Sequence, residues 1–139
     1  MVDVLTPRQR SFNMSRIRNR DTKPELIVRS IVHEMGFRYR LHKGDLPGKP
    51  DLVLVRHGKI INVHGCFFHM HHCKYGRVVP ASNAAFWSTK RLSNVERDKR
   101  NLRSLKKAGW KVLTVWECET KTVTSLVRKI EKFLSPLSI

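Results

Sequence analysis

Histidine and cysteine crowd into one short segment of this 139-residue chain. The segment from His64 to Cys73 holds four of the seven histidines and two of the three cysteines. The third cysteine, Cys118, follows much later, just after a predicted strand. A zinc ion takes four thiolate or imidazole ligands in a tetrahedron. One ion shared by these residues would tie the segment to a distant strand, which restricts the folds open to the chain.

The predicted zinc ligands are Cys66, His71, Cys73 and Cys118, a set that uses every cysteine in the chain. His71 is preferred to His72, because His72 adjoins Cys73 and leaves almost no backbone in which to turn both side chains onto one ion. Four protein ligands leave no open position, which is typical of a structural site rather than a catalytic one. The alternative is three unlinked thiols, buried or merely reduced.

Positive charge dominates the chain and is unevenly placed. There are 28 lysines and arginines against 11 aspartates and glutamates, a formal net charge of +17. Such a surface favours a polyanion, because phosphate contacts release counterions. From charge alone, the alternatives are a ribosomal-type or merely soluble basic protein and a membrane-surface binder. No carboxylate lies between Asp51 and Glu96, where the basic residues are Arg56, Lys59, Lys74, Arg77, Lys90 and Arg91.

Hydropathy and cysteine count indicate where the protein works. No apolar run approaches the ~20 residues that span a bilayer, and the Arg-rich start lacks the apolar stretch of a signal peptide. We therefore expect a cytoplasmic protein, in which three cysteines fit a metal site better than disulfides.

Residues 1–20 are expected to be a basic, mobile arm, either following a DNA groove or serving as a solubilising tail. Residues 21–139 are expected to form one domain.

Residue periodicity predicts the order helix, three strands, helix, strand, helix. The first helix starts at Thr22 to Glu25, which has the form of a capping box, and it ends at Gly36. The fold class is α/β, with a single mixed sheet flanked by helices. The other predicted elements are strands at residues 37–41, 52–55, 60–63 and 110–116, the second and third forming a hairpin, and helices at about residues 84–107 and 123–133.

An aspartate and a histidine would meet near one edge of the predicted sheet. Asp51 opens one strand of the hairpin and Val63 ends the other, so pairing can bring the Asp51 carboxylate beside the Val63 carbonyl. Mg²⁺ takes such oxygen ligands together with water and substrate phosphate. A neutral His69 could accept a proton from the attacking water if Asp98 orients its other ring nitrogen. Taken singly, an aspartate at a strand start is more often a turn cap, a histidine usually packs or is solvated, and Asp98 could form a surface ion pair with a neighbouring cation.

Together, these motifs resemble the very-short-patch repair (Vsr) DNA mismatch endonucleases, in order and with few length changes. The resemblance implies a restriction-endonuclease-like fold and a Mg²⁺-dependent enzyme. Such an enzyme nicks one strand on the 5′ side of the thymine in a T·G mismatch, which arises when 5-methylcytosine deaminates. The motifs that carry it are Asp21 to Glu25, Gly36 to Arg40, Asp45 to Asp51, Val63 to His69, His71 to Cys73, Phe86-Trp87, Asn94 to Asp98 and Gly109 to Cys118.

The resemblance also implies roles for single residues. Cys66, His71, Cys73 and Cys118 match the family's structural zinc ligands. In the catalytic set, Asp51 and the Val63 backbone carbonyl would bind Mg²⁺, His69 would be the general base with Asp98 as its partner, His64 would lie at the scissile phosphate, and Glu25 would lie near the metal waters. The Glu-x-Lys half of the usual nuclease signature is absent, and His64 and His69 would take its place.

Phe67, Phe68 and Trp87 match an aromatic wedge that the family pushes into the duplex beside the mismatch. A wobble pair stacks poorly on its neighbours. Stacking of the aromatic rings on the bases, ~1 to 3 kcal/mol per base, offsets the cost of unstacking that base-pair step. Phe68 stands where the family usually has Trp, which should weaken or reshape the stacking. The alternative for all three rings is core packing, although exposure is favoured for the two phenylalanines.

The implied partner is double-stranded DNA containing a T·G mismatch, without a membrane. The resemblance further implies a monomer that works beside mismatch-repair factors and a repair polymerase, in a bacterial cytoplasm and at the nucleoid when acting. Two other functions fit the same residues. One is a zinc-stabilised, non-catalytic DNA-binding protein. The other is a hydrolase in which zinc is the catalytic ion.

Overall fold

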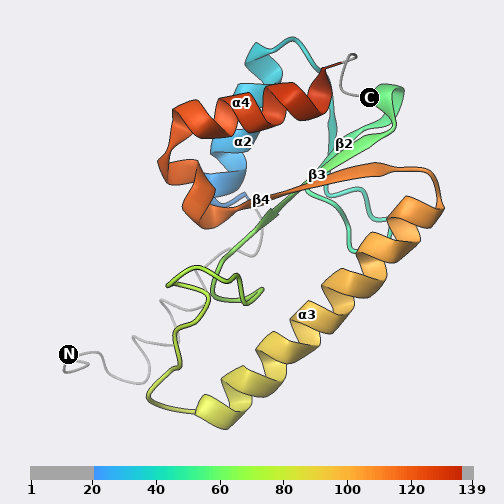
Figure 1. The fold of residues 1–139 in the computed structure, drawn as a ribbon. Coiled ribbons are helices and arrows are strands. Elements are labelled where there is room, and N and C mark those ends of the chain that lie inside the picture. Colours follow the sequence, from blue (N-terminus) through green and yellow to red (C-terminus); the bar gives the residue numbers. More distant parts are fainter. Residues whose placement is uncertain (1–20, 136–139) are drawn as a thin grey trace.

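The computed structural model describes residues 21–135. They form three helices and a four-stranded sheet in the predicted order, which is thereby confirmed (Figure 1). The predicted N-terminal arm lies outside the described residues. The elements are α2 (Lys23–Glu34), β1 (Arg40–Leu41), β2 (Leu52–Leu54), η1 (Val55–His57), β3 (Lys59–His64), α3 (Ala84–Lys107), β4 (Lys111–Trp116), η2 (Glu117–Lys121) and α4 (Val123–Leu134).

The sheet is mixed and has the strand order β1-β2-β3-β4. The first two pairs are antiparallel, and the predicted hairpin of β2 and β3 is confirmed. It turns at Gly58, whose φ of +65° suits glycine because no Cβ is present to clash. Strands β3 and β4 are parallel, with His64 beside Trp116 at their shared end. Parallel neighbours need a long crossover, and the 65–83 loop and α3 supply it.

The strand predicted over residues 37–41 is wrong in its first half, because only Arg40 and Leu41 pair with β2. The amide of Phe37 bonds to the Val32 carbonyl at the end of α2, so this backbone is committed to ending the helix. Phe37 and Tyr39 pack against the main core. Their alternation with arginines therefore reflects core packing of an irregular segment and not strand pairing.

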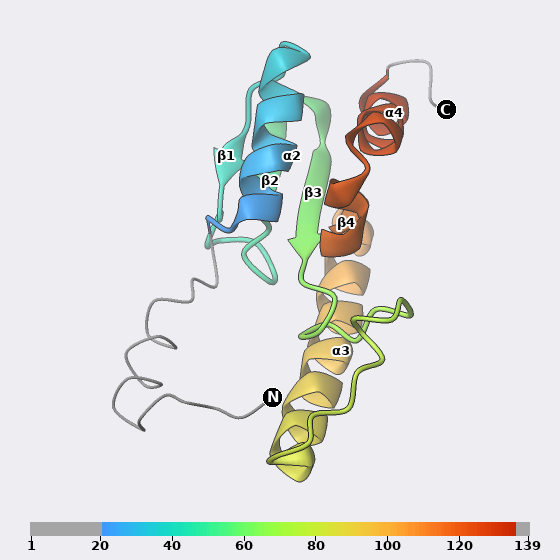
Figure 2. The same ribbon diagram turned by 90° about the vertical axis from the view of Figure 1, so that its left-hand side faces the viewer.

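The two faces of the sheet are covered differently, with α2 and α4 on one face and α3 on the other (Figures 1 and 2). Strand side chains alternate between the faces. The main core lies beneath α2 and α4, whereas the α3 face has a small apolar cluster of Val53, Ile60 and Leu105. The buried residues of the main core are Val28, Ile31, Val32, Leu52, Leu54, Ile61, Val63, Val115, Leu126, Ile130 and Leu134.

The rest of the α3 face is polar. Alternation along the strands places Asp51, Asn62 and His64 on the same face as Val53 and Ile60. These positions lie toward the end of β3 from which the histidine-rich loop departs. The alternation that builds the main core thus leaves polar side chains between the sheet and α3.

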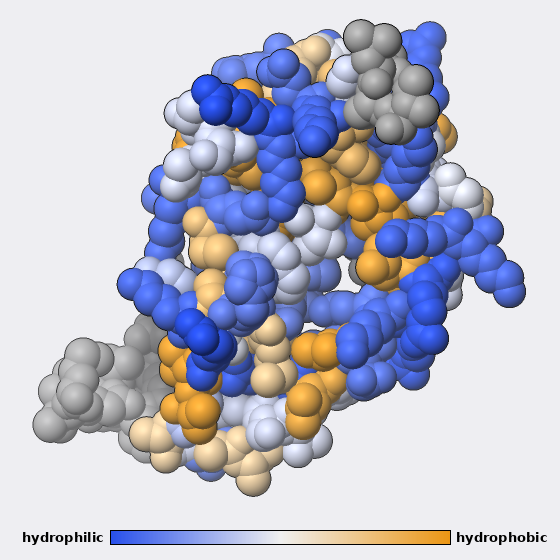
Figure 3. All heavy atoms as spheres, in the orientation of Figure 1, coloured by the Kyte–Doolittle hydropathy of each residue, from blue (hydrophilic) through white to orange (hydrophobic). Residues whose placement is uncertain are grey.

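Two cations expected on the basic surface are buried instead. Lys59 is 9% exposed and donates to the Phe133 carbonyl at 2.7 Å, and Arg91 is 4% exposed. The other four basic residues of that stretch, Arg56, Lys74, Arg77 and Lys90, are exposed. Hydrophilic side chains cover most of the face shown in Figure 3. Within residues 21–135, no helix has the length and apolar character needed to cross a membrane.

Candidate active site

A cleft of about 910 Å³ lies between the sheet and α3. Asp51 and His69, which the sequence predicted to act together, both line it. Residues of the loop between β1 and β2 close one side and α3 closes the other. The lining residues are Glu25, His42, Pro47, Gly48, Lys49, Asp51, Asn62, Val63, His64, His69, Arg97, Asp98, Asn101 and Leu102.

Asp51 enters the cleft from the residue before β2 and is largely buried. Its Oδ2 accepts a hydrogen bond of 2.6 Å from the Val63 amide, so the predicted closeness of Asp51 and Val63 is seen through the amide. Burial raises the pKa of the Asp51 carboxyl to about 6, although the Val63 hydrogen bond opposes the shift; the nearby Glu25 adds to it. A buried carboxylate that is short of positive partners favours a bound cation.

Glu25 and His42 lie on the same side of the cleft as Asp51. Glu25 is 3% exposed, and its Oε2 lies 3.1 Å from Arg29 Nη2 and 3.6 Å from His42 Nε2. The other ring nitrogen of His42, Nδ1, lies 3.8 Å from Asp51 Oδ1. His42 therefore lies between Asp51, the predicted Mg²⁺ ligand, and Glu25, which was predicted to lie near the metal waters.

The start of α2 explains why Glu25 faces inward. The amide of Glu25 donates to the Thr22 hydroxyl, as a capping box requires, but at a long 3.5 Å. The Glu25 carboxylate accepts from the Asp21 amide at 2.7 Å and not from that of Thr22. The predicted capping box is thus only half formed, and Glu25 is shared between the helix start and the cleft.

His69 and Asp98 form a pair across the cleft, with 2.6 Å between His69 Nδ1 and Asp98 Oδ2. A carboxylate at this position holds the ring proton on Nδ1 and leaves Nε2 as an acceptor. The ring of His64 stacks on that of His69, with centroids 4.0 Å apart. Burial lowers the pKa of His64 to about 4, with the neighbouring His69 acting in the same direction, so His64 is neutral near pH 7.

A strained turn in the loop points two histidines to different places. Met70 has a φ of +51°, in the left-handed region that residues other than glycine rarely adopt. On its two sides, His69 bonds Asp98, whereas His71 stacks on Trp116 at 4.3 Å, beside the cysteines.

Gly76 packs on the backbone of His71 so closely that a Cβ there would collide with the His71 carbonyl. The loop conformation thus depends on a glycine at this position.

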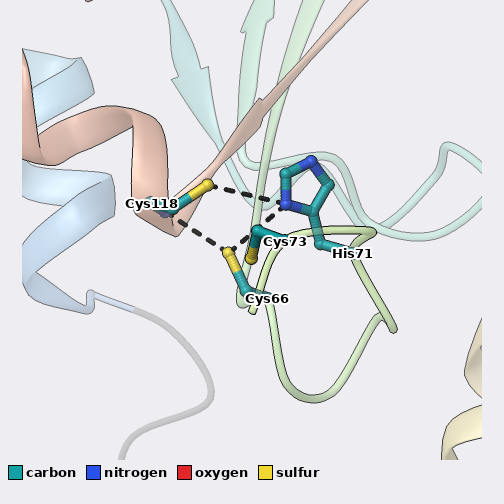
Figure 4. A group of neighbouring side chains, drawn as sticks. All are labelled: Cys66, His71, Cys73 and Cys118. Carbon is teal, nitrogen blue, oxygen red and sulfur yellow. Dashed lines mark hydrogen bonds between the residues drawn. The ribbon is translucent and has the colours of Figure 1, made fainter. Parts of the chain in front are cut away.

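Cys66, His71, Cys73 and Cys118 converge at the other side of this turn (Figure 4). One ligand atom from each lies within 4.8 Å of all the others. His71 Nδ1 is 3.5 Å from Cys118 Sγ and 3.8 Å from Cys66 Sγ. A tetrahedral zinc site with its usual bond lengths has ligand–ligand edges of about 3.6 Å. The donor set and its spread therefore fit zinc, and the three cysteines form no disulfide.

The thiol chemistry of this cluster also fits a cation. Burial raises the pKa of the Cys66 thiol to about 12 and raises that of Cys118. Burial acts in the same direction on Cys73, but hydrogen bonds with His71 and with the Gly76 and Tyr75 amides hold its pKa at about 6. Three neighbouring thiols cannot all ionise without a compensating positive charge, which a metal ion supplies.

The aromatic residues assigned to the wedge gather at the junction of the loop and the start of α3. Phe67 packs edge-on against Phe68 at 5.3 Å and against Trp87 at 5.5 Å. Phe68 is 40% exposed, and the other two are partly buried. Phe86, 59% exposed and 5.3 Å from Trp87, extends the group. The aromatic group is thus neither a closed core nor fully exposed.

Sequence reasoning missed His42 and Arg29, and it placed Phe86 in a matching motif without assigning it a role. The pairing of Leu41 with Leu52 sets His42 opposite Asp51, so strand register was the signal for it. That register depends on the long loop between the strands, which apolar patterning does not determine. Arg29 follows Glu25 by one helical turn, and this spacing could have identified it.

Comparison with known proteins gives consistent matches. A family model described as DNA mismatch endonuclease Vsr matches residues 2–75. The type II nicking enzyme V.XorIIP of Xanthomonas oryzae pv. oryzae is 40% identical over 136 residues, covering 98% of this chain and 99% of the relative. V.NmeAIP of Neisseria meningitidis is 42% identical over 138 residues, 94% and 98% of the two chains. DNA mismatch endonuclease Vsr of Escherichia coli strain K12 is 40% identical over 139 residues, 96% and 88%.

Proposed function

Because this chain belongs to the DNA mismatch endonuclease Vsr family and is a DNA endonuclease, we propose that it nicks one strand of duplex DNA on the 5′ side of the thymine in a T·G mismatch. The observation that carries the proposal is the shared cleft, lined by Asp51 and by the His69–Asp98 pair. A metal-ligating carboxylate and an oriented base are the two groups that phosphodiester hydrolysis by water requires. Membership of an enzyme family sets aside the non-catalytic alternative.

Asp51 and the Val63 carbonyl are the proposed Mg²⁺ ligands, with Glu25 near the metal waters. Support comes from the burial of Asp51 and Glu25, two carboxylates that lie on one side of the cleft. Arg29 contacts Glu25 and His42 contacts Asp51, so within residues 21–135 Arg29 is the one permanent cation in contact with the pair. Hard oxygen donors of this kind suit Mg²⁺. When bound, the ion would neutralise phosphate charge and stabilise the leaving oxygen.

His69 is the proposed general base. The Asp98 carboxylate keeps the proton on Nδ1, so Nε2 accepts the proton of the attacking water as the new phosphorus–oxygen bond forms and the bond to the leaving oxygen breaks. His64, neutral because it is buried, packs flat on His69 and keeps its ring orientation. It is the proposed neighbour of the scissile phosphate.

Zinc is the proposed structural metal at Cys66, His71, Cys73 and Cys118. All four positions of a tetrahedron are taken by protein atoms, so no position remains for water or substrate. The ion would fix the loop that supplies His69 to the end of β4. Fitting donor chemistry and the 4.8 Å spread of the ligand atoms support this assignment.

Phe67, Phe68 and Trp87 are the proposed wedge for the mismatch. The support is that the three rings pack on one another and that Phe68 is 40% exposed. We further propose a restriction-endonuclease-like fold, consistent with the mixed sheet and its helices on both faces. A monomer acting with mismatch-repair factors and a repair polymerase completes the proposal.

The test is strand cleavage of end-labelled duplexes that differ only in one T·G or T·A pair, with Mg²⁺ or with EDTA. Each strand is labelled in turn so that the cut is mapped. We expect one nick, 5′ of the mismatched thymine, only in the T·G duplex and only with Mg²⁺. Equal cutting of the matched duplex would refute the mismatch specificity, and cutting of both strands would refute the nicking activity.

A further inference from the structure

Arg91 is a buried arginine without an anionic partner. It lies in α3 and is 4% exposed, and within residues 21–135 it forms no ion pair with a carboxylate. Burying a charge is costly unless hydrogen bonds replace its hydration. The hydrogen bonds of the Arg91 guanidinium must therefore stabilise the buried charge, and the groups that accept them indicate its role.

The guanidinium holds the backbone of the histidine-rich loop at three places. Nε donates to the Phe67 carbonyl at 2.8 Å, Nη1 donates to the Val78 carbonyl at 2.8 Å, and Nη2 donates to the Gly76 carbonyl. The three acceptors bracket the segment that contains His71 and Cys73. Only a planar fork with several fixed N–H groups can satisfy carbonyls that converge in this way.

Arg91 also fixes a ring. Its guanidinium carbon lies 4.3 Å from the centroid of the Phe67 ring, within the range of a cation–π contact. Phe67 in turn packs against both Phe68 and Trp87. Through one ring, Arg91 therefore sets the position of the whole aromatic group.

Neighbouring residues of α3 hold the next two residues of the loop. Asn94 Nδ2 donates to the Phe68 carbonyl at 3.0 Å, and Asp98 bonds His69. Arg91, Asn94 and Asp98 lie on one helix face, because they are separated by three and four residues. Arg91 thus contacts the aromatic end of this row, whereas the contact to the base is made by a different side chain.

We propose that Arg91 is a positioning residue for mismatch engagement, a role that rests on the proposed function. It holds Phe67, and through Phe67 the exposed Phe68 and the partly buried Trp87, in the arrangement that meets the DNA. It acts on recognition and not on bond breaking, since His69 keeps its own bond to Asp98. The zinc ligands fix the loop to β4, and Arg91 independently fixes it to α3.

The first test is steady-state nicking of the T·G duplex by Arg91→Lys, with Arg100→Lys as the matched control on an exposed position of the same helix. Lysine keeps the charge but loses the fork and the stacking face. We expect KM to rise about tenfold with kcat within about threefold of the original protein. A loss confined to kcat, or a KM equal to that of the control, would overturn the proposal.

A double-mutant cycle tests whether Arg91 acts through Phe67. We expect Arg91→Lys to raise KM less than about twofold in a Phe67→Ala background, because the ring it positions is gone. If the increases in KM of the two single variants multiply in the double variant, the proposal is overturned, since Arg91 would then act by another route.

Amide hydrogen exchange separates positioning from folding and does not depend on activity. In Arg91→Lys we expect faster exchange over residues 67–79, with the zinc content of the control and only a small fall in melting temperature, since the buried ammonium makes fewer hydrogen bonds. Arg91→Met, which leaves no charge to bury, should show the same loop exchange if lysine is not tolerated. Loss of zinc and of stability in both variants would overturn the proposal in favour of a purely structural role. If the original protein fails to nick, the proposed function fails, and loop exchange still decides whether Arg91 orders the aromatic group.

Discussion

Two clusters of side chains that could hold a metal ion differ in chemistry and in access. The cluster of Cys66, His71, Cys73 and Cys118 offers soft donors, all from protein and all within 4.8 Å of one another. The cluster around Asp51 and Glu25 offers hard carboxylates on a cleft of about 910 Å³. A metal ion whose four positions are all taken by protein atoms can only stabilise the fold, whereas an ion with free positions can also bind substrate and water.

The two clusters share one loop. His69 faces the open cluster and His71 the closed one, and only Met70, in its left-handed conformation, separates them. Trp116 touches both sides, since its ring stacks on His71 at 4.3 Å and meets His64 edge-on at 5.3 Å. Although they share this loop and the contact with Trp116, the two clusters have no side chain in common. We therefore expect a change in one to be separable from a change in the other, and four experiments test this.

The largest effect is expected at the open cluster. His69→Ala should lower the nicking rate about 10³-fold, roughly 4 kcal/mol in the barrier, because the water loses its proton acceptor. Zinc content and melting temperature should not change. His33→Ala, which removes an exposed imidazole of α2, is the control and should nick normally. A slow His69→Ala protein that has also lost zinc would mean that the clusters are not independent.

The next effect is expected at the closed cluster. Cys118→Ser and His71→Ala should each lose zinc and lower the free energy of unfolding by about 3 kcal/mol, because the loop is released from β4. His72→Ala is the matched control and should keep the metal. Retention of zinc by His71→Ala, with loss in His72→Ala, would reverse the assignment of the fourth ligand. Metal analysis and thermal melting provide both measurements.

A smaller, opposite effect on stability is expected at Asp51 in Mg²⁺-free buffer. The folded protein raises the pKa of this carboxyl from 3.8 to about 6, so its ionised form destabilises the fold above pH 6 and the penalty is absent below about pH 4. That shift corresponds to about 3 kcal/mol at pH 7.5. Asp51→Asn should then be more stable than the original protein by about 2 kcal/mol, because its neutral amide accepts a weaker hydrogen bond from Val63 than the carboxylate does. The difference should disappear near pH 4. Denaturant unfolding at the two pH values checks it, and a destabilised Asp51→Asn protein at pH 7.5 would contradict it.

The smallest effect is expected at Asp98, which bonds the proposed base His69. Asp98→Asn should lower kcat about tenfold, since an amide holds the His69 ring but no longer stabilises its charged form. Glu96→Gln, an exposed change on the same helix, is the control and should have no effect. An Asp98→Asn protein as slow as His69→Ala would contradict this expectation, and it would mean that the tautomer and orientation of the His69 ring depend entirely on the carboxylate.

The regular elements could be predicted because their apolar periods are strong, as in β3 and α4. Residues 37–41 misled because Phe37 and Tyr39 alternate like a strand but pack into the core. The crowded cysteines and histidines indicated which residues gather in the closed cluster, because ligand chemistry restricts the residue types. Asp51 was placed by the predicted hairpin, and Glu25 by the family resemblance alone. His42 and the burial of Arg91 were not predictable, since both depend on how a long loop folds back on the sheet and α3.

The most direct test of the account is the nicking rate on the T·G duplex as Mg²⁺ is titrated, with the bound zinc measured in the same samples. The original protein should be inactive without Mg²⁺ and reach a maximal rate as Mg²⁺ rises, with about one zinc per chain throughout. Asp51→Asn should keep its zinc and remain slow at every Mg²⁺ concentration. Full activity without Mg²⁺ that falls in proportion to zinc removal would contradict the account and assign the chemistry to the zinc ion.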